Sequence, residues 1–222
     1  MAVSFLSQVP IANRRYNERK HLDDRYVPFN VSTLQEIAAK SVDRQRCVSI
    51  TKIAEGGFNR VFTLRMDDGF EVIAKIPYHI VIPHRYMTAS EVATMEFLRQ
   101  HADIPVPRVY TWSSDKANPV GAEYIIMEKV NGVVLGDVWW SLSGKQRLTV
   151  INQLVQVEAK MFQSPLPSYG SLFFSGFLPE KDVTRASNPN WCIGPDVNPS
   201  FWHDRRQDLK FDRGPCKSPP RP

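Results

Sequence analysis

The sequence has few cysteines and no long apolar run. These two features argue against a disulfide-rich protein, a thiolate metal site and a transmembrane protein. Its 222 residues contain three cysteines, Cys47, Cys192 and Cys216, which lie far apart. No C-x-x-C pair and no Cys/His cluster with zinc-ligand spacing occurs, so we expect neither a disulfide framework nor a thiolate metal site. The low count suggests a reducing, intracellular compartment. No stretch approaches the roughly 18 apolar residues of a transmembrane helix, so none is expected.

Acidic residues are scarce at the N-terminus. Glu18 is the single acid among the first 20 residues, which also carry Arg14, Arg15 and other basic side chains. Such a basic segment is typical of a mitochondrial presequence, although Pro10 would interrupt a helix. The alternative is a flexible, solvated terminus. We therefore expect residues 1–20 to be a flexible basic segment or a presequence, and a mitochondrial or a cytoplasmic location.

The charge of the chain is mildly basic, with a formal net charge of +5. No zinc-finger spacing and no aromatic-plus-basic RNA motif accompanies this excess, so we do not expect nucleic acid as a partner. A basic surface is compatible with a phosphate-bearing small ligand. The composition, 42% hydrophobic and 23% charged, is that of a globular protein.

Hydrophobic periodicity predicts an α+β fold whose first part is a five-stranded antiparallel sheet with one main helix. The Asp67-Asp68-Gly69 segment is a strong turn signal within it. Capping-box spacings at Ser32/Gln35, Thr33/Glu36 and Thr88/Glu91 predict where two helices begin. The expected elements are a helix at 32–42, three strands within 47–76, a helix at 89–100, and strands at 108–112 and 123–127.

The second half of the chain is expected to be helical at first and irregular later. A short helix is predicted at 134–140, and a longer one after the Ser143/Gln146 capping box. Prolines interrupt the pattern after Ser164, where we expect loops. The expected units are 21–130, a first domain; 131–215, a partial helical domain; and 216–222, a disordered tail. The apolar stripe of the longer helix would stay partly unburied, which predicts a loosely folded or aggregation-prone C-terminal third.

Four features that could carry chemistry follow one another in a fixed order. Gly56 and Gly57 join two strands, where backbone N–H groups could approach phosphate oxygens. Lys75 lies inside an apolar strand and needs an anionic partner, which Glu91 in the next helix could supply. An apolar strand then ends at Met127, before a polar break. Each feature alone has a structural explanation, such as a simple turn, a solvated lysine or a capping acid, but their order and spacing are more specific.

The chain from about Tyr16 to Asp212 resembles the fungal branch of the aminoglycoside-phosphotransferase-like family. That branch has protein-kinase-like folds and includes the altered-inheritance-of-mitochondria proteins. The segments that carry the resemblance are Arg25–Val31, Glu55–Phe62, Val72–Pro77, Ser90–Arg99, Ile104–Val109, Tyr124–Glu128, Phe201–Trp202 and Asp212–Pro215.

The resemblance implies ATP-dependent phosphorylation of a hydroxyl on an unidentified small molecule, with Mg²⁺. By this resemblance residues 21–130 would be a kinase-like N-lobe that binds the nucleotide, and residues 131–215 an incomplete helical C-lobe. Lys75 would contact the α- and β-phosphates, and Glu91 would orient it. The remaining nucleotide-binding positions would be Gly56, Gly57, Phe58 and Asn59 over the phosphates, and Met127 and Glu128 at the adenine hinge.

Phosphoryl transfer in this fold also needs an H-x-D-x-x-x-x-N loop and a later metal-binding Asp. The only candidate histidine after Glu128 is His203, which Asp204 follows directly, and no Asn stands at the required distance. The resemblance places both elements after residue 222, so we expect no catalytic or metal-binding residue in this chain and a negligible rate of transfer by it alone. Two alternatives stay open: a non-catalytic half-kinase that binds nucleotide or a partner, and a structural protein with a coincidental glycine turn.

Overall fold

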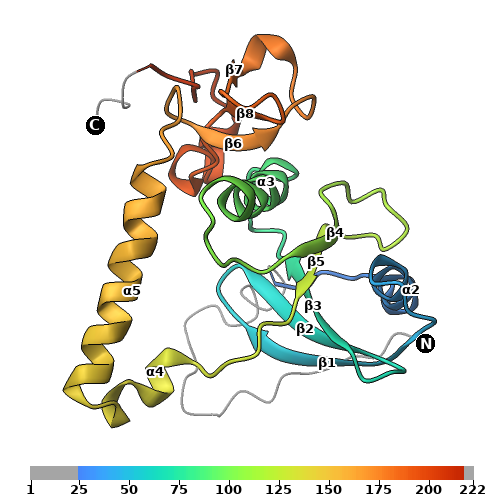
Figure 1. Ribbon diagram of the computed structural model, residues 1–222. Helices are drawn as coiled ribbons and strands as arrows, with labels where there is room; N and C mark the ends of the chain where they lie inside the picture. Colours follow the sequence, from blue (N-terminus) through green and yellow to red (C-terminus); the bar gives the residue numbers. More distant parts are fainter. Residues whose placement is uncertain (1–24, 218–222) are drawn as a thin grey trace, which may run out of the picture.

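The computed structural model describes residues 25–217 and contains two antiparallel sheets separated by a helix (Figure 1). The α+β class is confirmed. The predicted basic segment at 1–20 lies outside the described residues, as do residues 218–222 of the predicted tail. The first residue of that tail, Cys216, forms an antiparallel bridge with Tyr169, so the expected disorder at this position is wrong.

The larger sheet has the five antiparallel strands that the sequence predicted. Their order is β1-β2-β3-β5-β4, so the helix between β3 and β4 connects strands that are not neighbours. Lys75 pairs with Ile125, and Ile73 pairs with Met127. The strands are β1 (Cys47–Glu55), β2 (Asn59–Met66), β3 (Glu71–Pro77), β4 (Val109–Ser113) and β5 (Tyr124–Glu128).

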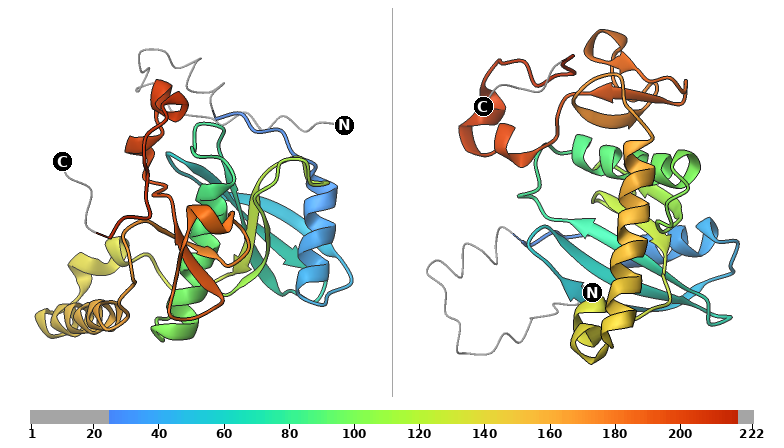
Figure 2. Two further views of the ribbon diagram at one scale, coloured as in Figure 1. Left: turned by 90° about the horizontal axis from the view of Figure 1, so that it is seen from above. Right: turned by 60° about the vertical axis from the view of Figure 1, so that its left-hand side comes forward.

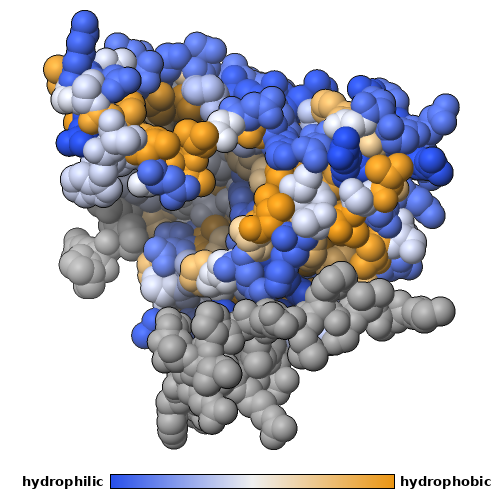
Figure 3. All heavy atoms as spheres, turned by 90° about the horizontal axis from the view of Figure 1, so that it is seen from below, coloured by the Kyte–Doolittle hydropathy of each residue, from blue (hydrophilic) through white to orange (hydrophobic). Residues whose placement is uncertain are grey.

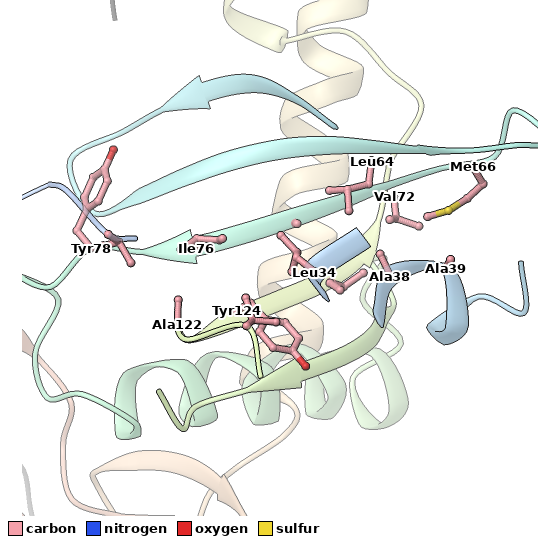
Figure 4. Close-up of a cluster of buried hydrophobic side chains, with 14 of the residues drawn as sticks. Leu34, Ala38, Ala39, Leu64, Met66, Val72, Ile76, Tyr78, Ala122 and Tyr124 are labelled. Atoms are coloured by element: carbon pink, nitrogen blue, oxygen red, sulfur yellow. The ribbon is translucent and has the colours of Figure 1, made fainter. Parts of the chain in front are cut away.

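Helix α2 (Val31–Ser41) covers one face of this sheet. Leu34 and Ala38 of the helix point toward Leu64 and Val72 of the sheet (Figure 4), and all four side chains are completely buried. Burial of this apolar surface supplies the main stabilisation of the first domain. The core on this face explains why β2 and β3 have the alternating apolar pattern that the sequence shows.

The start of α2 differs from the predicted one. The Asn30 side chain accepts a hydrogen bond from the backbone N–H of Thr33 at 3.1 Å, which makes Asn30 the N-cap. The capping boxes predicted at Ser32 and Thr33 are therefore wrong, because both residues already lie inside the first turn. Asparagine is among the most favourable N-cap residues, so the helix begins after Asn30 and not after the serine or threonine that follows.

Helix α3 (Tyr86–His101) lies against the other face of the sheet and begins earlier than predicted. Arg85 is its N-cap, and no side chain caps it. Thr88 is an interior residue whose hydroxyl donates to the Glu123 carboxylate at 2.6 Å, so the predicted Thr88/Glu91 capping box is wrong. Glu91 is consequently free of a capping role, and its carboxylate is available to the sheet.

A second sheet, in the order β6-β8-β7, stands where the sequence predicted loops. The prediction failed because its strands are only two to four residues long and prolines surround them. Phe173 and Ile193 are completely buried, so a loosely folded C-terminal third is wrong for this region. The strands are β6 (Ser171–Phe174), β7 (Thr184–Arg185) and β8 (Trp191–Gly194).

The second sheet packs on α3, on the side of the helix away from the first sheet (Figure 1). The indole N–H of Trp191 donates to the carbonyl of Ala93 at 3.2 Å. Tyr86 contacts Phe173, with ring centroids 6.0 Å apart. Helix α3 is therefore held between two sheets. Three short 3-10 helices follow or interrupt this region: η3 (Glu180–Asp182), η4 (Pro199–Phe201) and η5 (Asp204–Asp208).

Helix α5 (Gly144–Phe162) follows α4 (Leu135–Val138) and η2 (Trp139–Ser141), and it stands apart from the rest of the molecule (Figure 2). Its predicted capping box between Ser143 and Gln146 is confirmed. None of its residues is buried, and Phe162 is 88% exposed. Apolar residues gather on the surface around α4 and the start of α5, at the upper left of Figure 3. The unburied stripe is thus confirmed, and aggregation through it stays a prediction.

Candidate functional site

Lys75 is placed by the register of β3. Strand alternation buries Ala74 and Ile76 under α2 and directs Lys75 to the opposite face, toward α3. The Lys75 side chain is only 18% exposed. A lysine in such a position needs an anionic partner, because an unpaired buried ammonium is costly.

That partner is Glu91, as the sequence predicted. The Lys75 ammonium donates to the Glu91 carboxylate, and the two residues form an ion pair across the space between β3 and α3. The Glu91 side chain is 35% exposed, so the pair is partly accessible to solvent. The pair therefore fixes the ammonium on this face of the sheet.

The glycine turn joins the end of β1 to the start of β2 in the same sheet. Gly56 donates its N–H to the Asn59 carbonyl at 3.0 Å, which closes the turn between β1 and β2. Gly57 has no atom within 4 Å of where a Cβ would stand, and Phe58 is 59% exposed. The turn is thus accessible to a ligand, and only its last residue, Asn59, is partly buried.

Tyr78 anchors this turn, a role that the sequence did not reveal. Its N–H donates to the Phe58 carbonyl at 2.9 Å, and its hydroxyl donates to the Glu55 carboxylate at 3.0 Å. Burial and the bond to Glu55 raise the pKa of Tyr78 to about 12. Burial opposes the ionisation of Glu55, but hydrogen bonds from Lys52 and Tyr78 outweigh it and lower the Glu55 pKa. Tyr78 therefore holds both ends of the turn to the end of β3.

A cavity of about 290 Å³ connects the turn to the ion pair. This volume is at the lower end of the roughly 300–1,000 Å³ that is usual for small-molecule sites. Phe58, Asn59, Lys75 and Glu91 line it, which brings four of the predicted residues together. The other lining residues, which sequence reasoning missed, are Pro77, Ile80, Val81, Ile82, Met87, Thr88, Ile125, Pro199 and His203.

Met127 and Glu128 do not line this cavity. Met127 shares the face of Lys75, since it pairs with Ile73 two residues earlier on β3. The N–H of Glu128 donates to the Arg108 carbonyl at 2.8 Å, and the Glu128 carboxylate accepts from the Arg108 N–H at 3.1 Å. The Glu128 amide is therefore engaged with β4.

The described residues offer no metal centre. Within residues 25–217, no group of three or more His, Cys, Asp or Glu side chains could hold a metal ion. No helix in this part of the chain combines the length and the apolar character that crossing a bilayer requires.

Comparison with known proteins finds relatives in fungi. No protein-family model matches the chain. It is 45% identical over 174 residues to a subtelomeric hrmA-associated cluster protein of Aspergillus fumigatus, which covers 78% of this chain and 34% of that protein. It is 28% identical to altered inheritance of mitochondria protein 9, mitochondrial, of Eremothecium gossypii over 209 residues, and of Candida tropicalis over 214 residues. These matches cover 84% and 89% of this chain, and 33% and 34% of the two relatives.

The chain thus spans about one third of the length of the curated relatives it matches. The similarity extends over most of the described residues, including the region of the two sheets. It supports a relationship between this chain and the fungal proteins named for altered inheritance of mitochondria, and with it an intracellular, mitochondrial location.

Proposed function

We propose that the chain binds ATP in the cavity between β3 and α3, and that residues 21–130 are a kinase-like N-lobe. The observation that carries this proposal is the pairing of Lys75 with Glu91 inside that cavity. In protein kinases a strand lysine paired with a helix glutamate holds the nucleotide phosphates. The strand order and the position of α3 between β3 and β4 agree with such a lobe.

The residues present suit the phosphate end of a nucleotide. Lys75 supplies a positive charge that is shielded from bulk water, where its attraction for phosphate is stronger than at the surface. Phe58 and Asn59 of the turn line the same cavity, whereas Gly56 and Gly57 do not line it. Bound ATP would supply the transferable phosphoryl group. For adenine, Met127 and Glu128 remain the proposed hinge, with the backbone donor supplied by the residues after Glu128.

The residues present do not fit Mg²⁺. A magnesium site needs carboxylate or other oxygen ligands around the phosphates. Within the described part of the chain, Glu91 is the single carboxylate on the cavity lining, and it is paired with Lys75. We therefore propose nucleotide binding, and not phosphoryl transfer, as the activity of this chain, and we derive no step through a metal. The hydroxyl-bearing acceptor remains unspecified.

The second candidate function is partner binding without catalysis, and helix α5 favours it. Leu148, Ile151 and Leu154 are exposed on this helix by 58%, 46% and 57%. Contiguous exposed apolar surface commonly marks an interaction site. The two candidates are compatible, because α5 does not line the nucleotide cavity.

Thermal unfolding with and without nucleotide tests the proposal. A ligand at about 100 times its dissociation constant stabilises the folded state by about 2.7 kcal/mol. We expect ATP to raise the melting temperature of the chain, and Lys75→Met and Glu91→Gln to abolish that rise. Lys40→Met is the matched control, since Lys40 is exposed on α2, on the opposite face of the sheet. Equal stabilisation of Lys75→Met and the unaltered chain by ATP would contradict the proposal.

A further inference from the structure

The wall of the Lys75 cavity includes two residues from far along the chain. Pro199 and His203 line it together with Lys75 and Glu91, although more than 100 residues separate them from the ion pair. Both belong to the segment 198–203, which contains the 3-10 helix η4 and follows the second sheet. His203 does not begin an H-x-D-x-x-x-x-N loop, and the structure places it on the cavity lining.

The segment 198–203 is fixed to the helix that carries Glu91. The ring of Trp202 contacts Tyr86 of α3, with centroids 6.2 Å apart, and its indole N–H donates to the Asp196 carbonyl at 2.7 Å. The guanidinium of Arg213 lies 4.1 Å from the Trp202 ring centroid and donates to the Phe201 carbonyl at 3.3 Å. These contacts place His203 relative to α3 and hence relative to the ion pair.

His203 also lines a second hollow. That hollow has a volume of about 950 Å³, and Pro199 and His203 are the residues that it shares with the smaller cavity. Its other lining residues are mostly polar: Ser200, Arg206, Gln207, Asp208 and Leu209.

We propose that the segment 198–203 closes the nucleotide site and that the His203 imidazole donates a hydrogen bond to the phosphates of the bound nucleotide. The inference rests on the proposed nucleotide site, and it adds a phosphate contact from outside the kinase-like lobe. Among residues 25–217, Lys75 is the one lysine or arginine on the lining of the smaller cavity. A triphosphate carries several negative charges, so a second donor on the same cavity lining would add to the attraction for them.

Calorimetric titration of the full 222-residue chain with ATP, ADP and adenosine tests this assignment. One charge-assisted hydrogen bond is worth about tenfold in affinity. We expect His203→Ala to weaken ATP and ADP about tenfold and to leave adenosine unchanged. His79→Ala is the matched control, because His79 is exposed and its side chain lies outside the cavity lining; it should change none of the three affinities.

Hydrogen exchange on the unaltered chain gives a second readout that needs no substitution. ATP should slow exchange of the amides of Ser200–His203 and of the turn at 56–59, while β4 stays unchanged. If Lys75→Met bound ATP weakly and His203→Ala bound it normally, the role of His203 would be overturned, while the proposed nucleotide site would stand. An equal loss for adenosine and ATP in His203→Ala would also overturn it, because it indicates a structural role. Failure of the unaltered chain to bind any nucleotide would overturn the proposed function and this inference together.

Discussion

Trp191 joins the two sheets through α3, and its replacement by phenylalanine tests whether that contact stabilises the fold. The side chain is 2% exposed, and its indole N–H donates to Ala93 at 3.2 Å. Its ring contacts Phe97 and His101, with centroids 5.9 Å and 4.5 Å away. Trp191→Phe keeps an aromatic ring in the site but removes the donor and leaves unfilled space.

The lost hydrogen bond and the cavity left by the smaller ring together set the loss of unfolding free energy that we expect for Trp191→Phe. A hydrogen bond of this kind contributes about 1 kcal/mol. A residual cavity of about 40 Å³ costs about 1 kcal/mol more, at roughly 24 cal/mol per Å³. In Trp191→Phe the Ala93 carbonyl still accepts its hydrogen bond within helix α3. No buried acceptor is therefore left without a partner, and nothing more is added to the loss of unfolding free energy. The sum is about 2 kcal/mol.

Urea unfolding followed by far-ultraviolet circular dichroism measures this loss. The matched control is Trp140→Phe, because Trp140 is 81% exposed, and surface changes of this kind usually stay within about 0.5 kcal/mol. A loss below about 0.5 kcal/mol for Trp191→Phe would show that the second sheet does not brace α3 and would refute the reasoning. Nucleotide affinity, measured on the same variants, would report whether a looser α3 also weakens the Lys75 site.

Two further predictions concern stability. Gly170 has φ +149°, and a Cβ there would lie 2.3 Å from the Gly194 carbonyl oxygen, so Gly170→Ala should lose about 3 kcal/mol of unfolding free energy in urea titration. Gly176→Ala, at φ +83° with nothing within 4 Å, should lose only about 1 kcal/mol, and equal losses would count against the steric argument. Because the pKa of Tyr78 is raised to about 12, above about 10 for a free tyrosine, the folded state holds this proton more tightly. Its contribution to stability is complete below about pH 10 and is lost as the pH rises through about 12. Denaturation at several alkaline pH values should show that decline, and Tyr78→Phe should lack it; an identical decline in both chains would disprove the assignment.

Local signals in the sequence were sufficient for the larger sheet. Alternating apolar residues in 47–76 and the Asp67-Asp68-Gly69 turn predicted a meander, and β1, β2 and β3 form it. The Ser143/Gln146 capping box predicted the start of α5 correctly. These features succeeded because each depends on neighbours within a few residues, so that tertiary contacts have little opportunity to override them.

The second sheet could not be foreseen in the same way. Its strands are too short for alternation to be read, and Trp191 is buried because α3 covers it, not because of its own neighbours. The capping of α3 failed for a related reason. In the sequence, Glu91 stands at capping-box spacing from Thr88. In the folded chain the Thr88 hydroxyl instead donates a hydrogen bond to Glu123, 35 residues away.

The pair at the centre of the site can be predicted from local pattern: a lysine lies in an apolar strand and a glutamate in the following helix, and the cost of burying the lysine unpaired favours their contact. The other residues that border that pair depend on long-range packing. The packing of the second sheet on α3 carries Pro199 and His203 to the cavity, and no local pattern encodes a contact across more than 100 residues. Strand register is set by alternation along the chain, whereas the lining of a cavity between elements is set by packing between distant segments.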